Sequence, residues 1–121
     1  MLGIGIDAVD IDRFRRALTR TPSLRSRVFT ADELGGLAHK NDDAPSLAAR
    51  FAAREATMKV LGVGLGAFDL HDVSIESQAS GQPLLKVTGR ARQLAADRGI
   101  SEWHVSLSHT AQLAVAVVAA A

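Results

Sequence analysis

Two periodicities alternate along this chain and divide it into predicted strands and helices. Residues 2–9 alternate apolar with small or polar positions, the period of two that is typical of a strand. Residues 11–20 repeat apolar side chains every three to four positions, which indicates a helix with arginines on its other face. In the predicted strand, Asp7 shares its face with Gly3 and Gly5. We therefore expect another backbone or a ligand to approach that face closely.

The rest of the chain continues this pattern of helices and strands. Thr30 and Glu33 have the spacing of a capping box, which should open a short helix ending near His39. The strongest helical pattern covers residues 46–61, is capped by Asp43 or Ser46, and ends in a run of glycines. The other predicted elements are strands at 73–75 and 84–88 around a turn at 80–83, a helix at 89–98, and strands at 103–108 and 113–118. This order predicts one α+β domain over residues 1–121.

The last predicted strand differs from the others because both of its faces are apolar. Residues 113–118 read Leu-Ala-Val-Ala-Val-Val. A strand of this kind is usually buried on both sides. We expect it to lie centrally in the sheet or against another subunit.

The composition narrows the class of protein. The 121 residues are 47% hydrophobic and 22% charged, the balance of an ordinary globular domain. There is no cysteine, which excludes disulfides, thiolate metal sites and cysteine nucleophiles. The N-terminus lacks the basic and apolar regions of a signal peptide, and the longest apolar run is about half of a membrane span. We expect a cytoplasmic protein that does not associate with membranes.

Positive charge is concentrated near the N-terminus although the net charge is only +1. No acidic residue interrupts the stretch between Asp12 and Asp32, which contains Arg13, Arg15, Arg16, Arg20, Arg25 and Arg27. Such a stretch can be a solvated helix face, a nucleic-acid surface or a docking surface for an acidic protein. Only Phe14 offers a nearby aromatic ring for a base, and no known nucleic-acid module is visible, so we predict no nucleic-acid partner.

Glu55 and Lys59 lie four residues apart in the predicted long helix and so share one face. They could form an ordinary surface ion pair. Alternatively, an acid and a lysine that precede the glycine loop starting at Gly62 suit a phosphate–metal site, where glycines let backbone N–H groups approach phosphate. Mg²⁺ typically takes one or two carboxylates and completes its shell with phosphate and water. Asp7 could supply the second carboxylate if the first strand lies beside this helix.

The two histidines near the C-terminus are separated by five residues. His104 and His109 should therefore point to opposite faces of a strand, which disfavours a shared zinc ion. His109, between Ser108 and Thr110, is either a hydrogen-bonded turn histidine or a contact for phosphate or adenosine.

Three stretches in this order resemble the holo-acyl-carrier-protein synthase family of 4'-phosphopantetheinyl transferases. They are Gly3-Ile4-Gly5-Ile6-Asp7 with Ile11-Asp12-Arg13-Phe14, Ala49 to Ala56 with Lys59-Val60-Leu61-Gly62, and Ser106-Leu107-Ser108-His109-Thr110. The segments Phe29 to Leu34 and Gly81-Gln82-Pro83 also match. The similarity extends from the first residues to about Val118.

The resemblance implies an antiparallel sheet packed against a long helix, and a homotrimer with active sites at subunit interfaces. It implies transfer of 4'-phosphopantetheine from coenzyme A to a serine of an acidic apo-acyl carrier protein, for fatty acid biosynthesis, with release of adenosine 3',5'-bisphosphate. Asp7 and Glu55 match the Mg²⁺ ligands, and Glu55 and Lys59 the catalytic positions. The positions that match coenzyme A contacts are Arg50, Lys59, Gly62, Gly81, Pro83, Ser108, His109 and Thr110. Of these, Arg50 and His109 match positions that contact the nucleotide end, especially its 3'-phosphate. The positions that match the carrier-docking surface are Arg13, Arg16, Arg20, Arg25 and Arg27.

One position departs from the family pattern. Arg54 stands where family members usually have lysine, and we assign it no catalytic role, since a guanidinium differs in geometry from an ammonium. Two other functions remain open at this point, a binding module without transfer activity and a nucleic-acid protein. The pair Asp7 and Glu55 favours the enzyme, because two carboxylates near phosphate repel it unless a cation intervenes.

Overall fold

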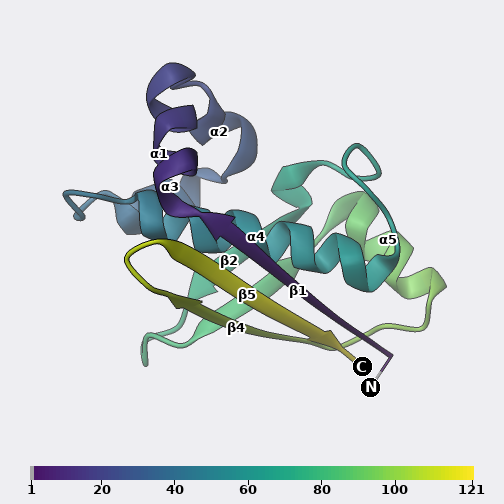
Figure 1. The fold of residues 1–121 in the computed structure, drawn as a ribbon. Helices are drawn as coiled ribbons and strands as arrows, with labels where there is room; N and C mark the ends of the chain where they lie inside the picture. The colour runs from purple at the N-terminus through teal and green to yellow at the C-terminus, as the bar shows by residue number, and fades with distance from the viewer. Residues whose placement is uncertain (1) are drawn as a thin grey trace.

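In the computed structural model, which describes residues 2–121, a long helix lies across a three-stranded antiparallel sheet (Figure 1). This helix, α4 (Ala44–Leu61), is rich in alanine, and its small side chains let other elements approach it closely. The other elements are β1 (Gly3–Asp10), α1 (Ile11–Arg20), α2 (Leu24–Val28), α3 (Ala31–Leu37), the 3-10 turn η1 (Leu70–Asp72), β2 (Val73–Ser77), β3 (Pro83–Val87), α5 (Gly89–Asp97), β4 (Trp103–His109) and β5 (Leu113–Ala120).

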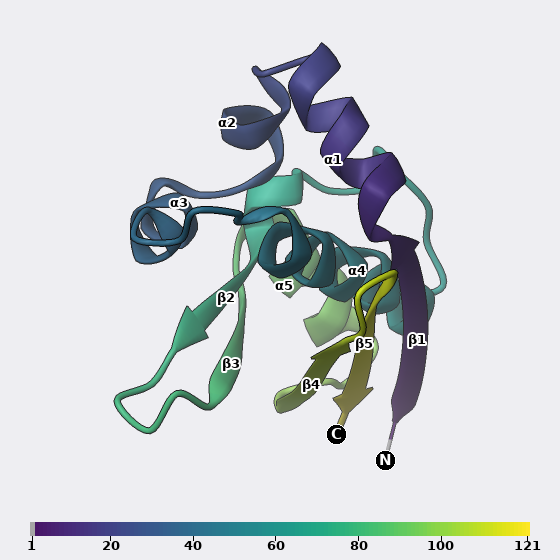
Figure 2. The ribbon, with the colours of Figure 1, turned by 60° about the vertical axis from the view of Figure 1, so that its left-hand side comes forward.

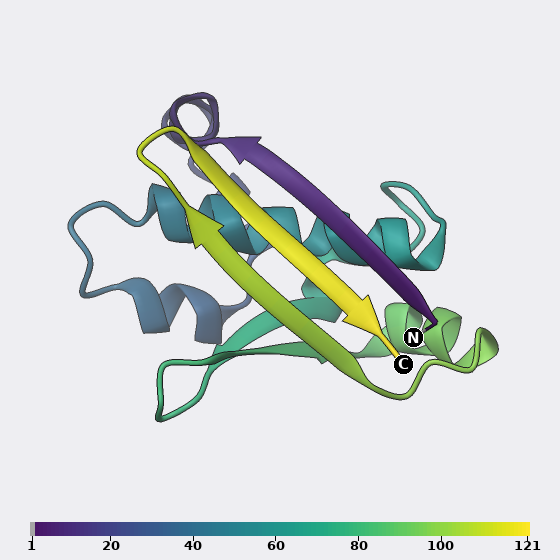
Figure 3. The same ribbon diagram turned by 60° about the horizontal axis from the view of Figure 1, so that its bottom comes forward.

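The strands form two separate antiparallel sheets. One has the order β1-β5-β4, with β5 in the centre as predicted, and the other is the β2–β3 hairpin. Figure 2 shows α4 nearly end-on, with β1 on one side of it and the hairpin on the other. Figure 3 shows the same separation from below. The expectation of an α+β domain with an antiparallel sheet against a long helix is confirmed.

Two glycines allow α4 to lie directly against β1. A Cβ atom at Gly5 would stand 2.2 Å from the carbonyl oxygen of Ala56, and one at Gly3 would stand 2.9 Å from Val60 Cγ1. Any larger residue at position 5 would therefore have to push the strand and the helix apart. The close approach predicted for this strand face is made by a backbone, and it brings Asp7 beside the C-terminal half of α4.

The structure contains two short elements that the periodicity did not predict. α2 has five residues and η1 has three, and segments this short carry too few positions to display a helical repeat. The boundaries of other elements shift slightly: α4 begins at Ala44 rather than residue 46, and α3 ends at Leu37. Asp43 is the N-cap residue of α4, but its side chain makes no capping hydrogen bond.

Strand β5 is not buried on both sides within one chain. Ala114, Ala116, Val118 and Ala120 are buried on the face towards α4. The residues that alternate with them face outwards and are only partly covered. On the same outer face, Ile4 of β1 is 63% exposed and Ile6 is 58% exposed. The apolar character of this second face is therefore not explained by the packing of a single chain.

A buried ion pair joins three elements on the opposite side of α4. The guanidinium of Arg54 bonds both carboxylate oxygens of Glu33 in α3, at 2.5 Å from Nη2 to Oε1 and 3.1 Å from Nη1 to Oε2. Glu33 also accepts from the backbone N–H of Thr30, which completes the predicted capping box, and from that of Ile75 in β2. Both charged side chains are almost fully buried, so each depends on the other for its charge compensation.

Among residues 2–121, no helix has both the length and the apolar character that crossing a membrane requires.

Replacing Gly5 with alanine should destabilise the protein. The added methyl group meets the Ala56 carbonyl oxygen, and overpacking of this kind costs about 1–3 kcal/mol. The free energy of unfolding, measured by urea denaturation, provides the test. Gly64→Ala is the matched control, because a Cβ there meets no atom within 4 Å, and surface changes of this kind stay within about 0.5 kcal/mol. Equal stability of the two variants would contradict this account of the β1–α4 contact.

Candidate active site

A groove of about 550 Å³ lies where β1 passes into α1 and both meet α4. Its polar wall includes Asp7 of β1, Arg13 of α1 and Glu55 of α4. Its apolar wall includes Phe14 and Phe51, whose ring centroids are 5.5 Å apart. The two carboxylates that sequence analysis paired across 48 positions (55 − 7) therefore line one groove.

Lys59 bonds to the strand rather than to Glu55. Its Nζ donates to the carbonyl oxygen of Ile6 at 2.7 Å and lies 3.2 Å from Asp7 Oδ1. Within the described residues 2–121, no ion pair joins Lys59 to Glu55. The alternative of a simple helical ion pair between these two residues is therefore not what the structure contains. Lys59 is more than half exposed and does not line the groove itself, but it contacts Asp7, which does.

The environment of Glu55 raises the pKa of its carboxyl group. Burial has the largest effect, the negative charge of Asp7 acts in the same direction, and Lys59 opposes both. The repulsion between Asp7 and Glu55 places the two carboxylates within electrostatic range of each other. A cation between them would relieve this repulsion.

The donor set of the groove fits a magnesium ion. Asp7 and Glu55 supply two carboxylates, the number that Mg²⁺ often takes from protein. No cluster of three histidine, aspartate or glutamate ligands occurs in the part of the chain that the structure describes. Further ligands would therefore be water or phosphate oxygen, which suits Mg²⁺ better than a site built wholly from protein.

The arginines of the basic stretch divide into paired and unpaired groups. Arg15 bonds Asp12 and Asp42, and Arg25 bonds Asp43 at 2.5 Å. For the other four, the structure of residues 2–121 contains no acidic partner; they are exposed in α1 and α2 and are Arg13, Arg16, Arg20 and Arg27. Since Arg13 also lines the groove, this basic surface continues up to the two carboxylates.

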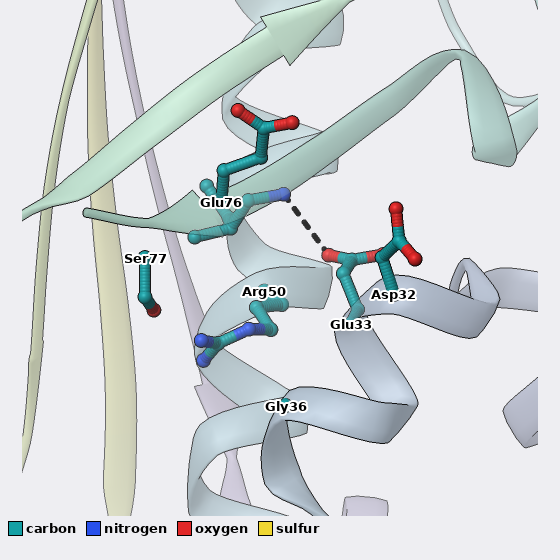
Figure 4. A pocket seen from close by; sticks show the side chains of 7 residues that line it. Asp32, Glu33, Gly36, Arg50, Glu76 and Ser77 are labelled. Atoms are coloured by element: carbon teal, nitrogen blue, oxygen red, sulfur yellow. Dashed lines mark hydrogen bonds between the residues drawn. The ribbon is translucent and has the colours of Figure 1, made fainter. Parts of the chain in front are cut away.

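Arg50 lies in a second cavity, on the other side of α4. This cavity, of about 340 Å³, is bounded by α3, α4 and β2, and Figure 4 shows the Arg50 side chain pointing into it beside Ser77. Its Nη1 donates to the carbonyl oxygen of Ser46, and its buried Nε has no hydrogen-bond partner. Burial lowers the pKa of Arg50, with a further effect from Arg54, and Glu33 opposes both.

Helix geometry explains why Arg50 is separated from Glu55 and Lys59. At about 100° per residue, Glu55 is about 140° and Lys59 about 180° around the helix from Arg50. The two groups therefore open onto different cavities of the same chain.

The remaining predicted contact residues lie at turns and at the end of α4. Gly81, at a positive φ of 85°, and Pro83 belong to the β2–β3 hairpin, which projects away from β1 (Figure 2). Ser108, His109 and Thr110 lie at the turn between β4 and β5. The Thr110 hydroxyl accepts from the N–H groups of Gln112 and Leu113 and closes this turn, while His109 remains exposed.

Gly62 ends α4 in the left-handed conformation, with a φ of 67°. Arg98 Nη1 donates to the Leu61 carbonyl oxygen at this helix end. The structure thus brings Asp7, Glu55, Lys59 and Arg13 together in one chain, and leaves Arg50, Gly81 and His109 outside the groove.

Comparison with known proteins decides the family. The profile of the 4'-phosphopantetheinyl transferase superfamily matches residues 3–118. This chain belongs to that superfamily. A curated relative, the holo-[acyl-carrier-protein] synthase of Streptomyces avermitilis, is 47% identical over 120 residues, which cover 99% of this chain and 97% of the relative.

Solved transferase structures have the same fold. The holo-[acyl-carrier-protein] synthase of Neisseria meningitidis has a TM-score of 0.89 and 29% identity, with 100% of this chain and 98% of that chain covered. The Helicobacter pylori enzyme, solved in complex with coenzyme A, has a TM-score of 0.84 and 29% identity, with 98% and 99% covered. The family that the sequence resemblance indicated is confirmed.

Sequence reasoning about this transferase missed several residues that shape its cavities. Glu33 was treated only as part of a capping box, although it also binds Arg54 and lines the cavity of Arg50. Phe14 was assigned to an apolar stripe and Phe51 to a motif, and neither was expected to line the carboxylate groove. For Glu33, the available signal in the sequence was a capping glutamate together with an arginine, Arg54, in a helix expected to be buried.

Removing the charge of Asp7 should lower the pKa of Glu55. In Asp7→Asn the repulsion that raises this pKa disappears, while burial remains, so the value should fall only part of the way to that of an ordinary glutamate. Titration of the Glu55 carboxyl by ¹³C NMR measures the change directly. Asp10→Asn is the control, because Asp10 lines the same groove but does not contribute to the shift. A Glu55 pKa that moved equally in both variants would contradict the pairing.

Proposed function

We propose that this chain transfers the 4'-phosphopantetheine group of coenzyme A to a serine of an apo-acyl carrier protein, releasing adenosine 3',5'-bisphosphate. The observation that carries this proposal is the groove in which Asp7 and Glu55 meet beside Lys59. It occurs in a chain whose curated relatives are named holo-[acyl-carrier-protein] synthases and cover it almost completely.

The groove supplies the charges that a diphosphate donor requires. Asp7 and Glu55 would hold Mg²⁺, which neutralises charge on the diphosphate when it is bound. Lys59, anchored to the Ile6 carbonyl oxygen, directs its ammonium to the same place and stabilises the leaving phosphate. Glu55, a carboxylate that faces the groove, or a water molecule held beside it would accept the proton of the attacking serine.

The carrier protein would approach over the basic surface of α1 and α2. The unpaired Arg13, Arg16, Arg20 and Arg27 attract an acidic partner and orient it, whereas Arg25 is partly neutralised by Asp43. Because Arg13 lines the groove, a carrier bound there would bring its serine to the carboxylates.

The complete site would be shared between copies of the chain in a homotrimer. One chain carries the carboxylate groove and, on the other side of α4, the cavity of Arg50. Arg50 would form a second half-site with the other positions that match coenzyme A contacts, which line neither cavity: Gly81, Pro83, Ser108, His109 and Thr110. The outer face of the β1-β5-β4 sheet, with Ile4 and Ile6 exposed, supplies an apolar surface for self-association. Association through this face would allow the groove of one copy to meet the second half-site of its neighbour.

A binding module without transfer activity is the second candidate. It would use the same cavities to hold coenzyme A but would not need the repelling pair Asp7 and Glu55. The presence of both carboxylates in one groove favours the enzyme, because a passive binder of a diphosphate gains nothing from two groups that repel it.

Glu55→Gln should abolish transfer while the protein stays folded. Loss of a carboxylate that holds a metal and accepts a proton lowers rates by at least about 100-fold. Mass spectrometry of apo-acyl carrier protein mixed with coenzyme A, Mg²⁺ and enzyme detects the addition of one phosphopantetheine per carrier. Glu102→Gln, at an exposed position beside β4, should retain full activity. Transfer at the normal rate by folded Glu55→Gln, or none by the unaltered chain, would refute the proposed reaction.

Val117→Lys should dissociate the trimer and with it the transfer activity. Val117 pairs with Ile6 and Ser106 across the outer sheet face, so a charge there would be buried in the proposed interface. Analytical ultracentrifugation measures the assembly, and circular dichroism checks the fold. Leu84→Lys is the control, since Leu84 is an exposed apolar residue that belongs to β3 of the other sheet. A monomeric unaltered chain with full activity would show that no shared site exists.

A further inference from the structure

We infer that Arg54 and Glu33 are positioning residues that set Arg50 at the distance and angle needed to bind the terminal 3'-phosphate of coenzyme A. The inference rests on the proposed function and adds to it two residues that touch neither substrate nor metal. It concerns the cavity between α3, α4 and β2, on the side of α4 away from the carboxylate groove (Figure 4).

Arg54 is fully buried and uses its guanidinium to connect three separate elements. Besides its two bonds to Glu33 in α3, its Nε donates to the Leu70 carbonyl oxygen of η1 at 2.8 Å. Its Nη1 also reaches the carbonyl oxygen of Arg50 at 3.3 Å, one turn earlier in α4. The guanidinium stands 5.0 Å from the ring centroid of Phe29. Each contact restrains the side chain in a different direction, so the group has one position.

These contacts fix the rotation of α4 about its own axis. Arg54 and Ala56 are two residues apart, which places them about 200° apart around the helix and so on nearly opposite sides. The Ala56 side is held by the close approach of Gly5, and the Arg54 side is held by Glu33 and Leu70. A helix held from both sides cannot turn, and Arg50 therefore points in a fixed direction.

The same network reaches Arg50 and the cavity wall directly. Glu33 lines the cavity and accepts from the N–H of Ile75, which also lines it (Figure 4). The negative charge of Glu33 acts on Arg50 and opposes the effect of burial on the pKa of Arg50. Within residues 2–121, the side chain of Arg50 makes a single hydrogen bond, to the Ser46 carbonyl oxygen, and its buried Nε is unpartnered. Because the side chain of Arg50 makes so few bonds of its own, its position depends on the helix and on the network of Arg54 and Glu33 that fixes the helix.

A lysine at position 54 could not reproduce these contacts. An ammonium carries three donors on a single atom, whereas the planar guanidinium spreads its donors over three nitrogens. Arg54 uses all three nitrogens: Nε for Leu70, Nη1 for Glu33 and Arg50, and Nη2 for Glu33. In this chain, the anchoring of η1 to α4 is therefore specific to arginine.

Discrimination between coenzyme A and 3'-dephospho-coenzyme A tests the inference. The ratio of kcat/KM for the two donors reports the contribution of the 3'-phosphate alone, since the substrates are otherwise identical. Arg50→Gln should lower this ratio by removing the phosphate contact. Arg54→Lys, which keeps a charge beside Glu33, should lower it by about tenfold through KM for coenzyme A, since weakening a hydrogen bond to a charged group has effects of this size. Its kcat should change little.

A second variant removes the buried charges together. Glu33→Gln/Arg54→Met leaves no uncompensated ion, so the chain should fold, although the single glutamine oxygen keeps only one of the two bonds from the N–H groups of Thr30 and Ile75. We expect the same fall in the ratio. Ala91→Gly, in the buried face of α5, is the control for lost stability: it should lower the melting temperature and leave the ratio unchanged.

The outcomes separate positioning from simple stabilisation. A lower ratio in both folded network variants, with an unchanged ratio in Ala91→Gly, supports the inference. An unchanged ratio in the network variants, a ratio that also falls in Ala91→Gly, or an unchanged ratio in Arg50→Gln overturns it. The proposed function is tested separately by assaying the unaltered protein. If the inference about Arg54 and Glu33 fails, the unaltered protein would still transfer phosphopantetheine from coenzyme A.

Discussion

The contact between strand β1 and helix α4 is the constraint on which the rest of the structure depends. Gly5 has no side chain at the point where the Ala56 carbonyl oxygen would meet it, and the helix can lie directly on the strand. Two residues further along the strand, Asp7 then reaches Lys59 and shares a groove with Glu55. A local feature of backbone packing thus produces the juxtaposition of charges that the proposed chemistry requires.

Helix α4 contacts other elements on both of its sides, because most of its surface is buried. Its alanines pack against the sheet, while Arg54 anchors the opposite side through Glu33. A buried ion pair of this kind contributes little net stability compared with apolar packing, but breaking it leaves an uncompensated charge. Its value here lies in geometry, since apolar contacts alone specify rotation less strictly than a set of directed hydrogen bonds does.

Much of the fold could be predicted from periodicity, and the omissions have physical causes. The long helix and the capping box at Thr30 followed from spacing, and the two apolar faces of β5 offered its central position as one of two alternatives. The short helix α2 and the turn η1 did not, because their stability comes from contacts with distant residues rather than from a repeat. The sequence left open what covers the outer face of β5, since an apolar face does not reveal whether its own chain or a neighbour covers it, and within one chain that face is only partly covered.

The sequence by itself determined the element types, the family, and the residue types able to bind phosphate and a divalent cation. These properties depend on residue spacing, on motifs and on side-chain chemistry, all of which can be determined from the sequence without coordinates. Only the tertiary structure decided that Lys59 bonds Asp7 rather than Glu55, that Arg50 opens onto a separate cavity, and that Arg54 is buried against Glu33. Such pairings depend on the distance between segments far apart in the chain, and that distance is set by how closely the helix and the strand can pack.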